Sequence, residues 1–216
     1  MASDGSSAAR RSLLLVLSGP GGVGKTSLLL EWRRRHPSLR YTVSVTTREP
    51  RPKAEQYEHI GADEFNALVA NGAFVQWINP PGLEFYGTRR APIDDSIRDG
   101  ADMVFDYVPE GYLNLRRAYP ENVVGIFVMA PSVETMRDRL ERRGTEADGE
   151  VDVRVEMAMK DFAFIDSHDY VVINDDFEAT MRTLEAIREA EHRRVERTAD
   201  SARFAALASP ALLRYY

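Results

Sequence analysis

The sequence contains no cysteine among its 216 residues. Disulfide bridges and thiolate metal sites are therefore excluded, and the composition predicts a reducing compartment, which we take to be the cytoplasm. Long apolar runs are also absent, since no stretch approaches the roughly 20 apolar residues of a membrane-spanning helix. The run LLLVL at 13–17 is shorter than the apolar core of about 7–15 residues in a secretory signal. We therefore expect neither a membrane span nor a cleaved leader.

Positive charge is in the minority. Lysine and arginine total 28 against 34 aspartates and glutamates, which gives a formal net charge of -6. Binding to DNA or RNA regardless of base sequence requires a basic face, so a nucleic-acid polymer is not a predicted partner. A small anionic ligand remains compatible with this charge, because a local group of arginines can hold it.

Apolar strand-like segments alternate with helical ones along most of the chain. The segments LLLVLS, ADMVFDYV, NVVGIFVMA and YVVIN are typical of buried strands, and helical patterns separate them. This alternation predicts an α/β fold with a parallel sheet covered on both faces. Three short strands, YTVSV, FVQWI and EFYGT, break the alternation and predict an inserted subdomain at about 41–88.

One domain is expected at 12–199, because a chain of this length can bury a single sizeable core. Its core is predicted at about 12–40 and 89–199. Residues 1–11 are predicted to be a disordered tail. The segment 200–216 is expected to be a tail that docks as a helix or packing segment.

The stretch SGPGGVGKTS at 18–27 fits the pattern G-x-x-x-x-G-K-[ST] between a strand and a helix. Glycines let the backbone turn so that its N–H groups converge on phosphate oxygens, and Lys25 adds a positive charge at the β- and γ-phosphates. The hydroxyl of Thr26 can bind Mg²⁺, which would arrive with ATP. The predicted donor-phosphate residues are Gly19, Gly21, Gly22, Val23, Gly24, Lys25, Thr26 and Ser27.

A second anion site is predicted at SVTTREPRP, residues 44–52. Arg48 and Arg51 lie three residues apart on a proline-stiffened loop, where two guanidinium groups can bind one small dianion. Ser44 in this stretch, and Tyr86 and Thr88 in FYGT, add hydroxyl groups.

Taken together these segments resemble the guanylate kinase family, over about residues 13–189. The segments LSGPGGVGKTS, SVTTREPRP, YEHIGADEF, FVQW, FYGT, MVFD, RLERRGTE and VVINDD follow the family order. The resemblance implies a three-layer P-loop kinase fold with a central parallel sheet, an inserted acceptor-nucleotide subdomain and a lid at about 139–155. It also implies transfer of the γ-phosphoryl group of Mg-ATP to GMP.

The resemblance implies roles for individual residues. The acceptor-phosphate clamp would be Arg48, Arg51, Tyr57 and Tyr86, and the hydroxyls touching the base would be Ser44 and Thr88. Asp106 would lie near the reacting phosphates, and Asn174 beside the donor adenine. Arg139, Arg143 and Arg154 match the arginines of the lid. Because phosphoryl transfer depends on aligning two polyanions and neutralising their charge, the predicted catalytic residues are Lys25, Asp106, Arg139, Arg143 and Arg154.

The sequence departs from the family in the base-reading pocket. Gln76 stands where the family has a glutamate, and Val108 stands where it has a second aspartate. A carboxylate accepts from the two adjacent donors of guanine, whereas a glutamine offers one acceptor and one donor. Gln76 would match adenine or cytosine, so an AMP-like, CMP-like or modified-base acceptor stands beside GMP as an alternative.

Three other classes remain open to different degrees. A kinase acting on a phosphorylated sugar would also lack the base-reading carboxylates. A non-catalytic binding module with this fold would be expected to lose Lys25 or the lid arginines, which are present. A signalling GTPase is disfavoured, because no N-K-x-D-like guanine-reading loop is found. The four histidines lack a spacing that indicates a metal site. Oligomeric state is not predicted.

Overall fold

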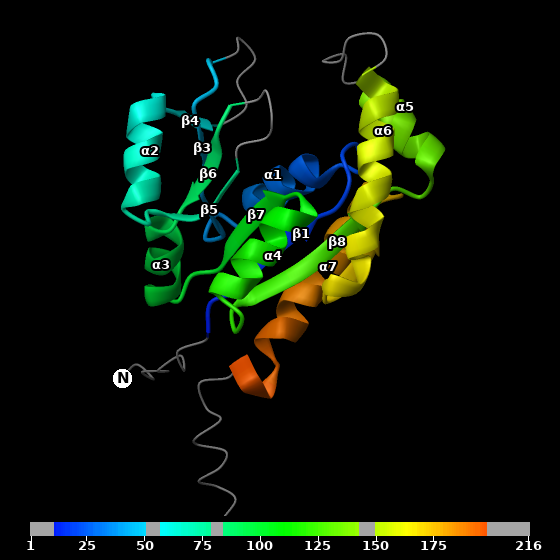
Figure 1. Cartoon of the computed structure of the whole chain (residues 1–216). Helices are drawn as coiled ribbons and strands as arrows, with labels where there is room; N and C mark the ends of the chain where they lie inside the picture. The colour runs from blue at the N-terminus through cyan, green and yellow to red at the C-terminus, as the bar shows by residue number, and fades with distance from the viewer. Residues whose placement is uncertain (1–10, 51–56, 79–83, 143–149, 198–216) are drawn as a thin grey trace, which may run out of the picture.

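The computed structural model describes residues 11–50, 57–78, 84–142 and 150–197, which form two β-sheets with flanking helices (Figure 1). The central sheet has the order β2-β7-β1-β8-β9, and every neighbouring pair is parallel. Its strands are β1 (Leu14–Ser18), β2 (Arg40–Tyr41), β7 (Met103–Tyr107), β8 (Val123–Met129) and β9 (Tyr170–Ile173). The parallel sheet predicted from the alternating pattern is confirmed.

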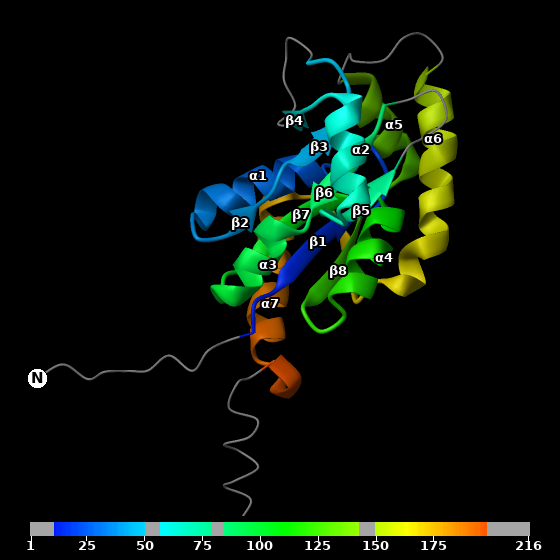
Figure 2. The same ribbon diagram turned by 60° about the vertical axis from the view of Figure 1, so that its left-hand side comes forward.

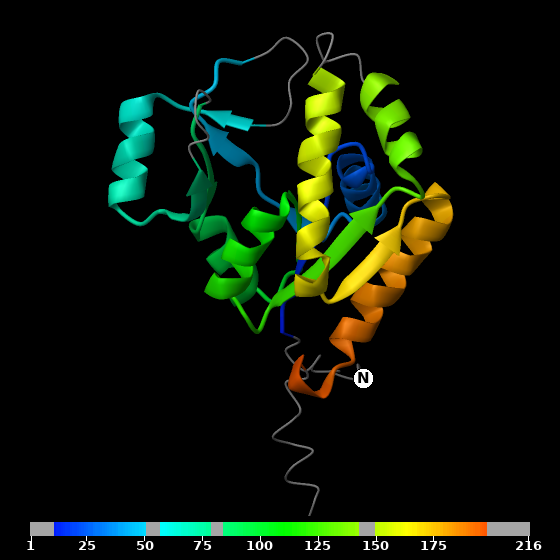
Figure 3. The same ribbon diagram turned by 45° about the vertical axis from the view of Figure 1, so that its right-hand side comes forward.

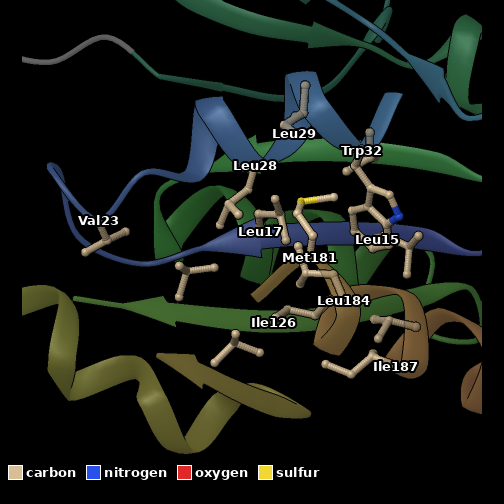
Figure 4. Close-up of a cluster of buried hydrophobic side chains, with 14 of the residues drawn as sticks. Leu15, Leu17, Val23, Leu28, Leu29, Trp32, Ile126, Met181, Leu184 and Ile187 are labelled. Carbon is tan, nitrogen blue, oxygen red and sulfur yellow. The ribbon is translucent and has the colours of Figure 1, made fainter. Parts of the chain in front are cut away.

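Helices cover both faces of the central sheet, which is why its inner strands β1 and β8 are largely apolar and buried. On one face, Leu15 and Leu17 of β1 pack against α1 (Lys25–Arg35) and α7 (Phe177–His192), with Trp32 fully buried between them (Figure 4). On the other face, Leu14 and Val16 pack with residues of α3 (Ala91–Arg98) and α4 (Pro109–Ala118). Figure 2 shows α3 and α4 in front of the sheet and α7 behind it.

The second sheet is the inserted subdomain, with the order β4-β3-β6-β5. It consists of β3 (Ser44–Thr46), β4 (Tyr57–His59), β5 (Phe74–Ile78) and β6 (Tyr86–Arg89), and α2 (Ala62–Ala70) packs on it through Phe65. The strands β5 and β3 both pair with β6 antiparallel, while β4 pairs with β3 in parallel. A two-layer unit of this kind has its own small apolar cluster.

One predicted strand is wrong. The pattern at 41–45 predicts a single strand, but the chain divides there between the two sheets. Tyr41 is in register with Val104 of the central sheet, whereas Ser44 begins β3 of the second sheet. The alternation of apolar and polar residues continues unchanged from β2 into β3, so the sequence pattern does not distinguish the two strands. They belong to different sheets because they pair with different neighbouring strands.

The helices α5 (Val133–Arg142) and α6 (Glu150–Asp161) stand on the opposite flank from the second sheet (Figure 3). The N–H of Thr135 donates to Ser132 Oγ across 3.1 Å, so Ser132 is the N-cap of α5. The 3₁₀ turns η1 (Phe162–Ser167) and η2 (Val195–Arg197) follow α6 and α7. The predicted tail at 200–216 lies outside the described residues. Within the described ranges, no helix has the length and apolar character needed to cross a membrane.

Candidate active site

The phosphate loop lies between the end of β1 at Ser18 and the start of α1 at Lys25. Gly24 caps the helix with φ +95°, a left-handed conformation that other residues rarely adopt. A Cβ atom on Gly19 would lie 2.5 Å from the carbonyl oxygen of Val128, so the loop also has to pass close to β8. Gly19 and Gly24, two of the glycines that the sequence assigned to a phosphate cradle, are therefore required by the turn itself.

Lys25 folds back over this loop. Its Nζ donates to the carbonyl oxygens of Gly19 and Pro20, each across 2.8 Å, and the residue is 9% exposed. The Nζ atom also lies 4.0 Å from Oδ1 of Asp106. The ammonium group is thus held at the mouth of the cradle, next to a carboxylate.

Asp106 meets the start of α1 because β7 is the neighbour of β1, with Leu17 and Asp106 in register. Thr26 Oγ1 donates to Asp106 Oδ2 across 2.6 Å. The structure therefore brings Asp106 together with Lys25 and Thr26, which the sequence predicted in a separate segment. Their hydroxyl and carboxylate oxygens are the kind of ligands that Mg²⁺ prefers.

A further carboxylate, which the sequence analysis missed, interacts electrostatically with Lys25. Asp161 is the last residue of α6. Burial raises the pKa of Asp161, while the charge of Lys25 acts in the opposite direction. Nothing in the local sequence signals this, because only the packing of α6 onto the core brings position 161 toward the loop.

Asn174 and Arg139 both donate hydrogen bonds to the phosphate loop at the carbonyl oxygen of Val23. Asn174 Nδ2 donates to the carbonyl oxygen of Val23 across 2.8 Å, and the residue is 5% exposed. Arg139 on α5 donates to the carbonyl of Asn174 across 3.0 Å and to that of Val23 across 3.4 Å. Sequence reasoning connected Asn174 with the donor adenine and did not find its contact with the loop.

The acceptor segment is fixed to the chain ahead of β6. Thr47 Oγ1 accepts from the N–H of Phe85, and the N–H of Thr47 donates to the Phe85 carbonyl. This pairing holds the next residue, Arg48, beside the two aromatic rings of Tyr57 and Tyr86.

The Arg48 guanidinium lies 5.3 Å from the ring centroid of Tyr57, and its Nη1 lies 3.5 Å from Tyr86 Oη. The two tyrosine rings contact each other edge to face, with centroids 5.8 Å apart. Three of the four residues predicted for the acceptor-phosphate clamp are therefore together. The fourth, Arg51, lies outside the described residues.

The predicted base-reading residues lie on the second sheet, with Ser44 and Thr88 on its inner strands and Gln76 on the edge strand β5. Ser44 is in register with Tyr57, and Gln76 is in register with Thr88. An unexpected residue joins them: Tyr107 Oη donates to Thr88 Oγ1 across 2.9 Å. Burial raises the pKa of Tyr107 and outweighs the opposite effects of Thr88 and Gln76, so the phenol stays protonated and keeps its donor.

Gln76 Oε1 is buried without a hydrogen-bond partner in the described part of the chain. Val108, at the position of the missing carboxylate, is 55% exposed and precedes α4. Among the other predicted residues, Arg143 lies outside the described residues, and of Arg154 only the backbone, within α6, is described.

Comparison with known proteins agrees with this arrangement. A family model described as guanylate kinase matches residues 11–191. The guanylate kinase of Carboxydothermus hydrogenoformans is 34% identical over 184 residues, covering 84% of this chain and 89% of that protein. That of Thermotoga maritima is 36% identical over 190 residues, covering 87% and 91%. The crystal structure of guanylate kinase from Anaplasma phagocytophilum has a TM-score of 0.72 and 26% identity, covering 93% and 96%.

Proposed function

This nucleoside monophosphate kinase belongs to the guanylate kinase family, and we propose that it transfers the γ-phosphoryl group of Mg-ATP to GMP. The observation that carries the proposal is the meeting of Lys25, Thr26 and Asp106 at the phosphate loop. A second cationic site, at Arg48 and the two tyrosines, suits the phosphate of the acceptor. Phosphoryl transfer between two polyanions held in this way requires the protein mainly to align them and to neutralise their charge.

On the donor side, the backbone N–H groups of residues 21–27 would bind the ATP phosphates at the start of α1. Lys25 would neutralise charge on the transferred group. Thr26 and Asp106 would hold Mg²⁺, and their oxygen donors, 2.6 Å apart, fit a hard cation. When bound, the ion would neutralise charge on the phosphate oxygens.

On the acceptor side, Arg48 would bind the monophosphate together with Tyr57 and Tyr86. A guanidinium that already packs on an aromatic ring is oriented before the ligand arrives, so less side-chain entropy is lost on binding. We assign Arg51 to the same clamp, and Arg139, Arg143 and Arg154 to charge neutralisation from a lid at about 139–155. Ser44, Gln76 and Thr88 would face the base.

The alternatives differ in the acceptor or in catalysis. A binding module without activity is disfavoured, because the lysine, the hydroxyl and the carboxylate at the phosphate loop are all in contact distance. A sugar-phosphate kinase could use the phosphate clamp of arginine and tyrosines, but it would not need a base pocket beside it. We therefore propose a cytoplasmic enzyme that acts on ATP and a nucleoside monophosphate.

The test is a coupled assay of ADP release with Mg-ATP and GMP. We expect GMP-dependent turnover, and a loss of at least about 100-fold in kcat for Lys25→Ala, because one charge on the transferred group is removed. Lys160→Ala is the matched control, since Lys160 is exposed near the end of α6. Turnover of a folded Lys25→Ala protein at the parent rate would refute the proposal.

A further inference from the structure

A groove follows the outer edge of the central sheet. The edge strand there is β9, and in the part of the chain that the structure describes only β8 pairs with it (Figure 3). The groove has a volume of about 490 Å³ and runs along β9 and the first turns of α7. The residues that line it include Val171, Ile173, Asp175, Asp176, Ala179 and Thr183.

The part of the groove that β9 forms is apolar and exposed. Val171 is 51% exposed and Ile173 is 58% exposed. Because these residues are two positions apart on a strand, their side chains lie on the same face, opposite to the buried Val172. An exposed edge strand with apolar side chains tends to pair with other chains, and natural proteins usually cover such an edge. An apolar segment lying in the groove would therefore stabilise this side of the sheet.

The segment 198–216 begins next to the start of β9. Arg197 Nη1 donates to the carbonyl oxygen of Asn122 across 3.1 Å, and Arg197 Nε lies 3.1 Å from Glu191 Oε2. The other oxygen of this carboxylate accepts from Tyr170 Oη across 2.5 Å, and Tyr170 is the first residue of β9. The Glu191 carboxylate thus connects the residue that precedes the segment to the strand that forms the groove.

The segment has the length and the side chains that the groove requires. At about 3.3 Å per residue, residues 198–216 can extend over about 60 Å, whereas the four residues of β9 span about 13 Å. The stretch FAALASPALL at 204–213 consists of apolar and small residues, and Arg214 follows it. The guanylate kinase family model ends at residue 191, so this stretch lies beyond the part shared with the family.

We infer that residues 204–214 occupy the groove of the same molecule, with their apolar side chains against Val171 and Ile173. Burial of these side chains removes apolar surface from water on both partners. Because Arg197 is already held beside β9, the loop that has to close is short, and the entropy lost on docking is correspondingly small.

The order of apolar and charged groups supports this assignment and sets its direction. Going away from Arg197, the groove is first apolar and then acidic, at Asp175 and Asp176. Going away from Arg197 along the chain, the segment is first apolar and then basic, at Arg214. Opposite charges therefore meet when the segment runs in the same direction as β9.

Since the chain has no cysteine, one engineered thiol can report on the groove. In Val171→Cys, we expect a maleimide to react at least about tenfold more slowly with the full chain than with a chain truncated after Arg197, because the thiol reacts only when the segment leaves the groove. The matched control is Leu30→Cys, 50% exposed on α1 and outside the groove, whose rate should not depend on the segment. Equal rates for Val171→Cys in the two chains would overturn the inference.

A charge reversal tests the direction. Arg214→Glu, made in the Val171→Cys protein, should raise the labelling rate toward that of the truncated chain, because a carboxylate would face Asp175 and Asp176. Arg117→Glu is the charge-matched control, since Arg117 is exposed on α4 and contacts Asn114. No effect of Arg214→Glu, or an equal effect of both substitutions, would contradict the assignment of this segment to the groove.

A pair of thiols identifies the occupant. Oxidation of Ile173→Cys with Leu213→Cys should give a disulfide within one molecule, seen on a non-reducing gel as a monomer of altered mobility. Leu30→Cys with Leu213→Cys is the control and should not give this band. Failure of the first pair to join would overturn the inference. Disulfide dimers that form faster with Ile173→Cys alone than with Leu30→Cys alone would show that a second copy covers the edge, and would overturn it as well.

Discussion

The side-chain amide of Asn174 donates to the carbonyl oxygen of Val23 across 2.8 Å, and this bond joins the end of β9 to the phosphate loop. The two residues are 151 positions apart in the sequence. The N–H groups of the phosphate loop have to point toward the phosphates, so its carbonyl groups have to point away from them. The buried amide of Asn174 holds the Val23 carbonyl in that orientation and does not occupy the phosphate site.

Asn174→Ala should therefore loosen the loop. Loss of one buried hydrogen bond predicts a decrease of about 1–2 kcal/mol in the free energy of unfolding. The KM for ATP should rise by about tenfold, with a smaller change in the KM for GMP, as steady-state kinetics and urea unfolding can measure. The control is Asn66→Ala, an exposed amide on α2. An unchanged KM for ATP would contradict a role in holding the loop.

Gly24→Ala is predicted to abolish tight ATP binding. At φ +95° a side chain is strained, and the new Cβ atom would lie 2.6 Å from Asn174 Nδ2. Gly72→Ala is the matched control: Gly72 also has positive φ, +64°, but a Cβ atom there would meet nothing within 4 Å. It should cost only about 1 kcal/mol of stability and leave kcat unchanged. Calorimetric titration with ATP distinguishes the two, and equal affinities would refute the argument.

Arg48→Lys keeps the charge but removes the planar group that packs on the Tyr57 ring. Because an ammonium cannot donate two parallel hydrogen bonds to a phosphate, we expect the KM for GMP to rise by about 10- to 100-fold at nearly constant KM for ATP. Arg98→Lys serves as the control, since Arg98 is exposed on α3 and contacts only neighbouring aspartates. A parallel rise in both KM values would indicate a general structural defect instead.

Asp102 predicts a pH dependence of stability. Burial opposes its charge, but hydrogen bonds from His192, the Leu13 N–H and Arg188 outweigh this and lower the pKa of Asp102 below its usual value. A depressed folded pKa stabilises the fold above the unfolded pKa of about 3.9, and this contribution is lost as the pH falls through both values. The free energy of unfolding should therefore decrease below about pH 5.

Asp102→Asn should flatten that dependence and cost about 3 kcal/mol at pH 7, because it leaves the half-buried Arg188 guanidinium without the carboxylate of a residue that is 6% exposed. Urea unfolding from pH 3 to 7 measures both effects. Asp138→Asn, an exposed carboxylate on α5, should follow the parent curve. If Asp102→Asn also follows it, the cluster does not cause the acid sensitivity.

The sequence by itself determined the phosphate loop and the parallel sheet, because both depend on local rules. Glycine spacing fixes the turn at 19–24, and apolar runs separated by helical periods fix the strands. The start of α1 at Lys25 and of α7 at Phe177 follows from the same local chemistry, including the Asp176 side chain that accepts from the N–H of Ala179.

Only the tertiary structure decided which of these residues are neighbours. Tyr107 looks like the last apolar position of a buried strand, and nothing local shows that its hydroxyl crosses to Thr88 in the other sheet. The same holds for Asp161 beside Lys25 and for the division of 40–46 between two sheets. The local sequence around a hydrogen-bonding side chain does not show which residue is its partner. The partner is determined by which strands and helices lie next to each other in the fold.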